Sequence, residues 1–309
     1  MVIVRTGRRT QVRLAMLASV VSLGLLAACS GTPGGSMTSM PASSSAPPVV
    51  SSQGSTAPLE SLSAPRLSPV YWLGEGDSTV YLYREYVKAE DQGDPVTTAI
   101  KYLTEQQPDD PDYFNVWSRA SRIGTSISAD NVITVDISAD AFSHVLDEGL
   151  AQRAIQQLVY TASAAAAAAG LLSQNPPASV NVLVDGHSGY NAFGHVKLTG
   201  PIQRDASLRA PIWIIDPQQD TDHAPGKVRV HGISGAFPGG THWVLKRQED
   251  GKGTRVAGGR LALGDGELAD NEFEATPVLE AGTYTLAVWG QAADEDKRLS
   301  QDTKQFTVR

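Results

Sequence analysis

Apolar and polar positions follow two different patterns along the chain. Between residues 67 and 204, short alternating runs are separated by two segments with a helical period, whereas after residue 205 only short alternating runs remain. Alternation with a period of two is typical of strands, and a period near 3.6 residues is typical of helices. The pattern therefore predicts an α/β domain over residues 67–204 and an all-β domain over residues 205–309.

The first of these domains combines strands with two helices. Asp94 and Pro95 supply an N-cap and a first-turn proline for the first helix, and an alanine-rich segment predicts the second. In chain order the expected elements are a strand at 80–83, a helix from 94 to 103, a hairpin of 123–127 with 133–137, a helix from about 147 to 172, and a strand at 180–184. The order β-α-β-β-α-β predicts a ferredoxin-like sandwich with both helices on one face of a four-stranded sheet.

The second domain consists of short apolar runs separated by Gly, Asp, Asn and Pro, which predicts a β-sandwich. Tyr284 follows a turn at Gly282 and begins an apolar strand, so it is a candidate tyrosine corner, with an ordinary core tyrosine as the alternative. The domain has no cysteine, and its core is expected to form around Trp243, Phe273 and Trp289. The fold class of the whole chain is therefore α+β.

Residues 1–28 have the layout of a secretory signal. Four arginines and no acid lie in the first thirteen positions, and Leu14–Ala28 is uncharged and almost wholly apolar. This stretch is shorter than the roughly twenty residues that a helix needs to cross the bilayer. Leu26-Ala27-Ala28-Cys29 looks like the lipobox of bacterial lipoproteins, which predicts a lipid on Cys29. An ordinary signal peptide is the alternative, and Arg8-Arg9 leaves Sec and twin-arginine export both open.

Residues 29–66 are dominated by Ser, Pro, Gly, Ala and Thr, with Glu60 and Arg66 as the charged positions. Such a segment buries too little apolar surface to offset the entropy of ordering, so it is expected to form a disordered tether. Two acyl chains on one residue are enough for stable membrane anchoring. Cys29 is the only cysteine of the chain, so no disulfide requires it. These features predict a location on the outer, extracytoplasmic face of the cell membrane.

Charge excludes some classes of partner. Four of the 25 basic residues lie in the signal, which leaves 21 against 33 acidic residues and a net charge near −12. A surface of this sign is repelled by nucleic acid and by anionic lipid head groups. Membrane lipid attached to Cys29 is therefore the expected means of holding the protein at the membrane.

Motifs that carry chemistry were not found. The six histidines never have the i, i+4 spacing of a helical zinc pair, and there is no second cysteine for a thiolate site. The serines near glycines lack the Gly-x-Ser-x-Gly spacing of a nucleophile elbow. The acidic stretch at residues 264–272 does not follow the spacing of a calcium-binding loop. The sequence therefore predicts no catalytic, cofactor-binding or metal-binding residue.

Two known families share local patterns with this chain. The patterns of the first half are Tyr81–Arg84, Val135–Ser138, Gln156–Thr161 and Val182–Gly186. In this order they resemble the GerM-type sporulation and spore germination (GerMN) domain, which implies a ring-building-type α/β fold. The patterns of the second half are Ile212–Pro217, Val228–Gly232, Gly282–Leu286 and Phe306–Arg309. They are similar to the immunoglobulin-like domain of bacterial spore germination proteins.

The resemblance implies a function in the envelope. Known relatives of the first domain are lipid-anchored envelope proteins, some of which build rings in sporulation, and the same pair of domains occurs in bacteria that do not sporulate. We therefore expect a non-catalytic module for protein–protein interaction or assembly, whose partners are envelope proteins or further copies of the chain.

The alternative function is binding of peptidoglycan or another glycan. It requires exposed aromatic rings that stack on sugars, and the candidates are Trp72, Trp117, Tyr190 and Trp213. An enzyme is the third hypothesis, although no sequence motif indicates an active site.

Overall fold

The computed structural model describes residues 67–262, 271–293 and 297–309. The described residues all belong to one compact unit. The predicted signal, Cys29 and the tether lie outside the described residues. Within the described ranges, no helix is both long enough and apolar enough to span a membrane.

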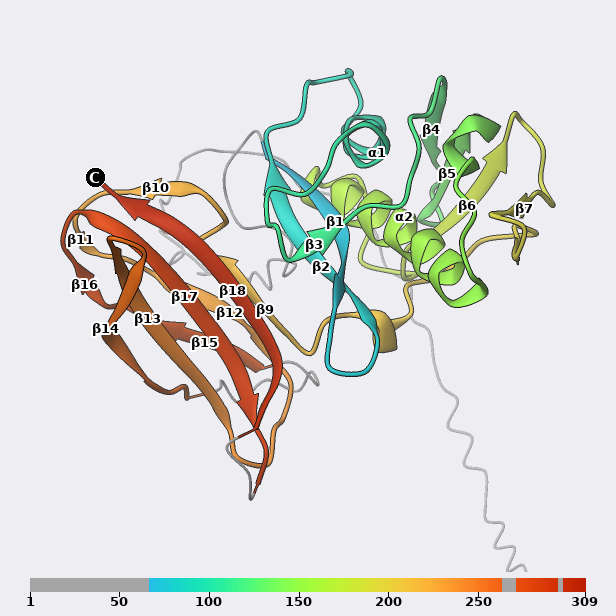
Figure 1. Ribbon diagram of the computed structural model, residues 1–309. Helices are drawn as coiled ribbons and strands as arrows, with labels where there is room; N and C mark the ends of the chain where they lie inside the picture. Colours follow the sequence, from blue (N-terminus) through green and yellow to red (C-terminus); the bar gives the residue numbers. More distant parts are fainter. Residues whose placement is uncertain (1–66, 263–270, 294–296) are drawn as a thin grey trace, which may run out of the picture. The chain divides into compact units, whose positions relative to one another are not determined.

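The first half contains two helices and two three-stranded sheets (Figure 1). The first sheet has the order β2-β1-β3 and the second the order β4-β5-β6. The elements are β1 (Ser68–Glu75), β2 (Val80–Val87), α1 (Pro95–Glu105), β3 (Tyr113–Phe114), β4 (Ile123–Ile127), β5 (Val132–Ile137), α2 (Glu148–Ala168) and β6 (Ser179–Val184). A small hairpin of β7 (Asn191–Ala192) and β8 (Val196–Lys197) follows.

Several predicted elements are confirmed at close to their expected bounds. Asp94 caps α1, since its carboxylate accepts a hydrogen bond from the backbone N–H of Thr97 at 2.7 Å. Asp147 caps α2 in the same way through Leu150 at 3.0 Å. The predicted hairpin is the antiparallel pair β4 and β5, and β6 lies parallel to β5.

The sheet arrangement differs from the expected single four-stranded sheet. An additional strand, β1, precedes the predicted first strand and pairs with β2 along its whole length. Its residues Pro69–Gly74 are all buried, so its sequence lacks the alternation that reveals a half-exposed strand.

Helix α2 packs against β1 where the short strand β3 does not reach. The backbone N–H of Tyr71 donates to the hydroxyl of Thr161 at 3.0 Å, and the side-chain amide of Gln157 donates to the carbonyl of Tyr71 at 2.9 Å. Buried backbone groups need such partners. Two polar side chains of α2 thus replace a missing strand partner.

The second half is largely β and consists of several sheets. One has five strands in the order β10-β18-β17-β13-β14, and another has three in the order β15-β12-β9. The strands are β9 (Ile212–Asp216), β10 (Thr221–His223), β11 (Gly226–Lys227), β12 (Val230–Ser234), β13 (Thr241–Glu249), β14 (Lys252–Arg260), β15 (Asn271–Ala275), β16 (Val278–Leu279), β17 (Gly282–Gln291) and β18 (Arg298–Val308). Apolar side chains of both sheets form one core.

Strand β9 contributes to two cores. Ile212 and Ile214 belong to the core between the five-stranded and three-stranded sheets, whereas Trp213 and Ile215 belong to the core of the first half. Alternate residues of a strand point to opposite faces, so both faces of β9 are buried. The domain boundary near residue 205 stays a prediction.

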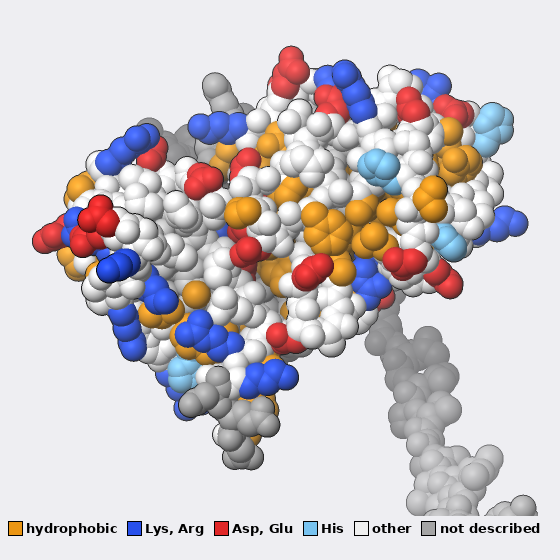
Figure 2. Space-filling model, in the orientation of Figure 1, with side chains coloured by type: hydrophobic (Ala, Val, Ile, Leu, Met, Phe, Trp, Pro, Cys, Tyr) orange, Lys and Arg blue, Asp and Glu red, His pale blue; other side chains and the backbone are white. Residues whose placement is uncertain are grey.

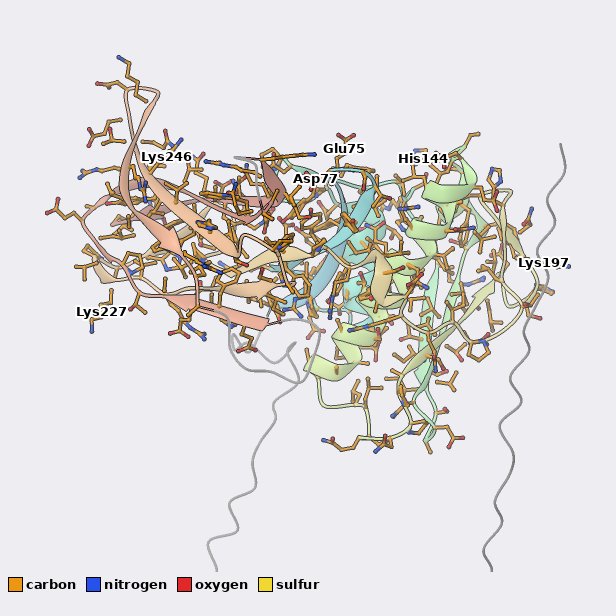
Figure 3. All side chains as sticks on the ribbon, turned by 90° about the horizontal axis from the view of Figure 1, so that it is seen from below. Glu75, Asp77, His144, Lys197, Lys227 and Lys246 are labelled. Carbon is orange, nitrogen blue, oxygen red and sulfur yellow. The ribbon has the colours of Figure 1, made fainter. Side chains whose placement is uncertain are left out.

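Charged side chains are distributed unevenly over the second half. In Figure 2, Lys and Arg gather over the region where Figure 1 draws β13 and β14. Figure 3 shows Lys246 of β13 and Lys227 of β11 on opposite sides of this half. Basic side chains therefore gather on one side of the five-stranded sheet.

Candidate functional site

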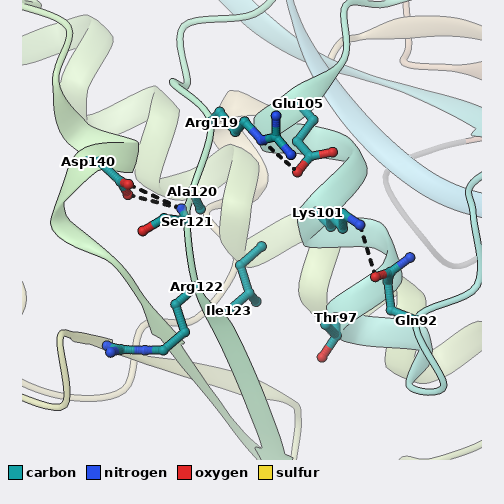
Figure 4. Close-up of a pocket in the computed structure, with 10 residues that line it drawn as sticks. All are labelled: Gln92, Thr97, Lys101, Glu105, Arg119, Ala120, Ser121, Arg122, Ile123 and Asp140. Carbon is teal, nitrogen blue, oxygen red and sulfur yellow. Dashed lines mark hydrogen bonds and ion pairs between the residues drawn. The ribbon is translucent and has the colours of Figure 1, made fainter.

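A polar groove of about 610 Å³ lies between α1 and β4 (Figure 4). Its side chains come from the loop before α1, from α1 itself, from the segment that leads into β4 and from the turn after β5. They are Gln92, Thr97, Lys101, Glu105, Arg119, Ala120, Ser121, Arg122, Ile123 and Asp140. Both signs of charge are present, so the groove offers contacts to a polar partner.

Local interactions hold the charged side chains of the groove. Arg119 forms an ion pair with Glu105 at 3.2 Å, and Lys101 donates to Gln92 at 3.0 Å. Asp140 accepts from the hydroxyl of Ser138, which is the main reason why its pKa is lowered. The geometry contains neither a nucleophile beside a base nor a convergent set of metal ligands, which are the marks of catalytic sites.

The edge strand β4 borders this groove. In the described part of the chain β4 pairs on one side, with β5, and its other edge has no strand partner. Gly124 and Ser126 are exposed on this strand. An open strand edge presents unpaired N–H and C=O groups to which another chain can add a strand. This edge and the polar groove together are the candidate interaction site.

A second polar cluster is buried where the two halves meet. Lys304 of β18 lies 2.5 Å from the carboxylate of Asp110, 2.7 Å from the hydroxyl of Tyr113 and 3.8 Å from the carboxylate of Asp302. Tyr113 donates to Asp302 at 2.8 Å, and the backbone N–H of Ile214 donates to the other oxygen of Asp302 at 2.6 Å. The cluster joins the segment before β3 to β18 and β9.

Burial shifts the acid–base equilibria of this cluster. Desolvation raises the pKa of Asp302, although the charge of Lys304 opposes the shift. Desolvation also raises the pKa of Tyr113 well above its usual value, with a further contribution from the negative charge of Asp302. The charged and hydroxyl groups of the cluster have partners from both halves, so the cluster links the two halves.

A buried glutamate positions Asp110. Glu85 of β2 accepts hydrogen bonds from the backbone N–H groups of Asp109 at 3.1 Å and Asp110 at 2.8 Å. Burial raises the pKa of Glu85, and the charge of Lys304 opposes the rise. The sequence did not reveal this cluster, although the alternation of β18 places Asp302 and Lys304 on the same face as Phe306 and Val308. Two charges on an otherwise apolar face were the available signal.

The other predicted residues have the following places. The hydroxyl of Tyr284 donates to the carbonyl of Glu280 at 2.8 Å, a backward bond of the kind expected in a tyrosine corner, and the assignment stays a prediction. Cys29 lies outside the described residues, as does most of the acidic stretch at 264–272. Within the described ranges, no group of three His, Cys, Asp or Glu side chains could hold a metal ion.

The tryptophans contradict the expectation on which glycan binding rested. Trp72, Trp117 and Trp213 are buried in the core of the first half, at 0%, 3% and 3% exposure. Tyr190 is half-buried and contacts Phe142.

Trp289 was expected in the second core but lies on the outer face of its sheet. Leu286 and Val288 point into the core, and Trp289 has the opposite position in the alternation of β17. A β-strand sends alternate residues to opposite faces, and the bulge near Trp289 does not change its side.

Comparison with known proteins finds one family match, within the first half. Residues 69–189 match the family Germane, described as sporulation and spore germination. No curated protein matches the chain. The solved structure of the tandem GerMN domains of the sporulation protein GerM from Bacillus subtilis is similar at 20% identity and a TM-score of 0.32, over 46% of this chain and 47% of that one. The chain thus spans about half of that structure.

A second solved structure, the first GerMN domain of the same Bacillus subtilis protein, is similar at 16% identity and a TM-score of 0.32. The likeness covers 45% of this chain and 95% of that one. The family is not known as catalytic. Residues 69–189 of this chain therefore match the family Germane, and the match covers less than half of the chain.

Proposed function

We propose that this protein is a non-catalytic module for protein–protein interaction or assembly at the cell envelope. The observation that carries the proposal is the open edge of β4 beside a polar groove, within a Germane domain. A partner chain, either another envelope protein or a second copy, would add a strand at this edge and place polar side chains in the groove.

The composition of β4 supports this use of its edge. Proteins usually protect an exposed edge with lysine, proline, a bulge or a covering segment. The sequence Ile123-Gly124-Thr125-Ser126-Ile127 contains neither charge nor proline, and its pairing with β5 runs without a register shift. A regular edge without charge, proline or bulge favours addition of a further strand, and α1 contacts β4 through the hydrogen bonds of Thr125 to Asp94 and Thr97.

The proposal includes an anchor and a second surface. A lipid on Cys29 would hold the chain at the outer face of the cell membrane, and residues 29–66 would act as the tether. The β-rich half would adopt an immunoglobulin-like arrangement and contribute a second contact surface. Its two facing sheets around one core and the hydrogen bond of Tyr284 support this part.

Site-specific crosslinking tests the interaction site. Gly124→Cys and Ser126→Cys place a thiol on the edge of β4, and a Cβ at Gly124 meets no atom within 4 Å. Lys197→Cys on β8 is the matched control, because Lys197 is exposed but lies away from this edge. In intact cells, a maleimide–diazirine photocrosslinker should link both edge variants to a partner and leave the control monomeric. The maleimide reacts with the introduced thiol, and the photogenerated carbene inserts into the partner without needing a thiol there. Only monomer in all three variants, under conditions that capture known complexes, would contradict the proposal.

Metabolic labelling tests the anchor separately. Cells given an alkyne analogue of palmitate should label the natural chain and not the Cys29→Ala variant, because no other cysteine is present. The variant should also leave the membrane fraction. Equal labelling of both chains would show that Cys29 is not the lipidated residue.

A further inference from the structure

The outer face of the five-stranded sheet carries a group of cations that the proposed function does not use. Cross-strand pairing places Lys246 of β13 directly opposite Arg255 of β14. His242 lies opposite Arg260 on one side and Trp289 on the other. Arg298 of β18 contacts the ring of Trp289. We call these six residues the cationic face: His242, Lys246, Arg255, Arg260, Trp289 and Arg298.

Alternation establishes that these side chains point away from the core. Leu245 and Leu286 pair across β13 and β17 and belong to the buried core. Their neighbours Lys246 and Thr285 pair in the next position and therefore point to the opposite side. Lys246 lies on the side opposite Lys227 in Figure 3, and Figure 2 shows basic side chains gathered over this part of the sheet.

The four cations of this face lack acidic partners among the described residues. The ion pairs there include no carboxylate within 4 Å of Lys246, Arg255, Arg260 or Arg298. The chain as a whole has more acidic than basic residues, 33 against 25. Like charges directly opposite each other on neighbouring strands also destabilise a sheet. Fold stability therefore does not explain the pair of Lys246 and Arg255.

Contacts within the face restrain its guanidinium groups. The guanidinium of Arg298 lies 3.9 Å from the centroid of the Trp289 ring and donates to Gln301 at 2.9 Å. A Cβ placed on Gly258 would lie 3.2 Å from a terminal nitrogen of Arg255, so this side chain extends across the glycine. Restrained guanidinium groups bind carboxylate or phosphate with less loss of entropy than flexible ammonium groups do.

The remainder of the face is uncharged and combines polar side chains with the apolar pair Val244 and Ala287. Thr283 and Thr285 of β17 lie opposite Thr307 and Gln305 of β18, and Gln248 donates to Thr285 at 2.8 Å. Hydroxyl and amide groups both donate and accept hydrogen bonds, as sugar hydroxyls do. The ring of Trp289 lies between His242, at 6.0 Å between centroids, and Arg298, so it is not free to enter a lipid bilayer. This combination suits a charged sugar polymer better than a membrane surface.

We infer that the cationic face binds an anionic polysaccharide of the cell envelope. Lys246, Arg255 and Arg298 contact carboxylate or phosphate groups of the polymer, and the threonine and glutamine side chains contact its hydroxyls. The site lies in the β-rich half and does not involve the edge of β4. The inference rests on the proposed envelope location, but failure of strand addition at β4 leaves it intact.

Binding of defined polymers to the full chain in neutral detergent tests the inference. Fluorescent polygalacturonate should bind, and the affinity should fall by about tenfold or more in the double variant Lys246→Glu/Arg255→Glu, because two attractive charges become repulsive. Rising salt should weaken binding of the natural chain. Lys227→Glu, on the opposite side of the same half, should bind as the natural chain does. An equal affinity of the double variant and the natural chain would overturn the inference.

Three further probes separate sugar polymers from other anions. Neutral dextran should not bind, and polyglutamate, an anionic chain without sugars, should bind more weakly than polygalacturonate. Detergent micelles that contain phosphatidylglycerol should not displace the polysaccharide. Equal binding of polyglutamate would reassign the face to an acidic protein surface, a second copy included, and displacement by phosphatidylglycerol would reassign it to the membrane. Thermal unfolding of each variant checks that the fold is retained.

Discussion

The two faces of the five-stranded sheet use charged residues in opposite ways. On the inner face, Asp302 and Lys304 continue the row of Phe306 and Val308 and are 3% and 1% exposed. Their partners come from a segment almost 200 residues earlier in the chain. On the outer face, Lys246 is exposed and lies beside another cation.

This difference distinguishes charges that stabilise the fold from charges that can bind a ligand. A buried ion needs partners that replace its hydration, and the inner cluster supplies them for Lys304. An exposed cation retains water and costs little when unpaired, so it can be kept for a ligand. Five experiments test how buried polar groups and exposed charges contribute to the fold, in order of decreasing expected effect.

Replacing Lys304 with methionine should have the largest effect. The substitution leaves the carboxylates of Asp110 and Asp302 buried without their cation, and breaking a buried pair in this way typically costs about 3–5 kcal/mol. Denaturant unfolding should report the loss. Lys246→Met on the outer face is the matched control and should change stability by less than about 0.5 kcal/mol.

A double variant shows whether uncompensated charge causes that loss. Asp110→Asn removes the charge and retains the side-chain oxygen that accepts from the backbone N–H of Asp112 at 2.9 Å. Lys304→Met/Asp110→Asn should therefore be more stable than the sum of the two single effects predicts. Simple additivity would show that packing, and not charge, accounts for the cost of Lys304→Met.

His231 of β12 is a buried titratable side chain, so the free energy of unfolding should depend on pH through this residue. Its side chain is buried, and desolvation lowers its pKa, while Glu272 at 3.6 Å opposes the shift. The unfolded chain, with a histidine pKa of about 6.5, then binds a proton that the folded chain does not. The stability contribution is present above pH 6.5 and is lost as the pH falls, by about 1.4 kcal/mol for each unit of pKa depression.

Unfolding at pH 7.5 and pH 5 measures this effect. The difference in stability between the two pH values should be smaller in His231→Leu than in the natural chain, since the variant cannot bind the proton. Arg229, Glu274 and Asp216 also lie near this histidine. They are present in both chains, so their titration cancels to first order. An identical pH dependence would contradict the assignment.

Tyr284→Phe should have a moderate effect. It removes the hydroxyl that donates to Glu280 and leaves the ring in the core, where it stacks on Phe306. Loss of one such hydrogen bond should reduce the free energy of unfolding by about 1 kcal/mol. No measurable change in a thermal or denaturant melt would favour an ordinary core tyrosine over a tyrosine corner.

The smallest expected effect is an increase in stability, whereas Lys304→Met and Tyr284→Phe should decrease it. Lys246→Glu replaces a like-charge pair with a cross-strand ion pair to Arg255, which should increase stability by about 0.2–1 kcal/mol. The same change should weaken polysaccharide binding. A loss of stability would instead show that a carboxylate already pairs with Lys246, and would remove the main argument for a ligand on this face.

Much of the local structure could be predicted from the sequence. The caps Asp94 and Asp147, the hairpin of β4 and β5, and strand β6 follow from short-range rules, because an N-cap or an alternating run depends on a few neighbouring residues. Strand β1 was missed because it is buried on both faces and therefore does not alternate. Neither the open edge of β4 nor the groove has a sequence signature, since each depends on which strand lies beside which.

The sequence by itself determined the α+β composition, most of the element bounds, the negative net charge and the signal-like N-terminus with Cys29. The tertiary structure decided which aromatic side chains are buried and which charges find partners. Trp72 and Trp213 were candidates for the exposed rings that the alternative of glycan binding requires, and they lie in the core. Trp289 was expected in the core and lies on the outer face. The physical reason is that burial depends on contacts between distant segments. Lys304 and Lys246 are both lysines on β-strands of one sheet, and only the segment that covers Lys304 makes one of them structural and leaves the other free for a ligand.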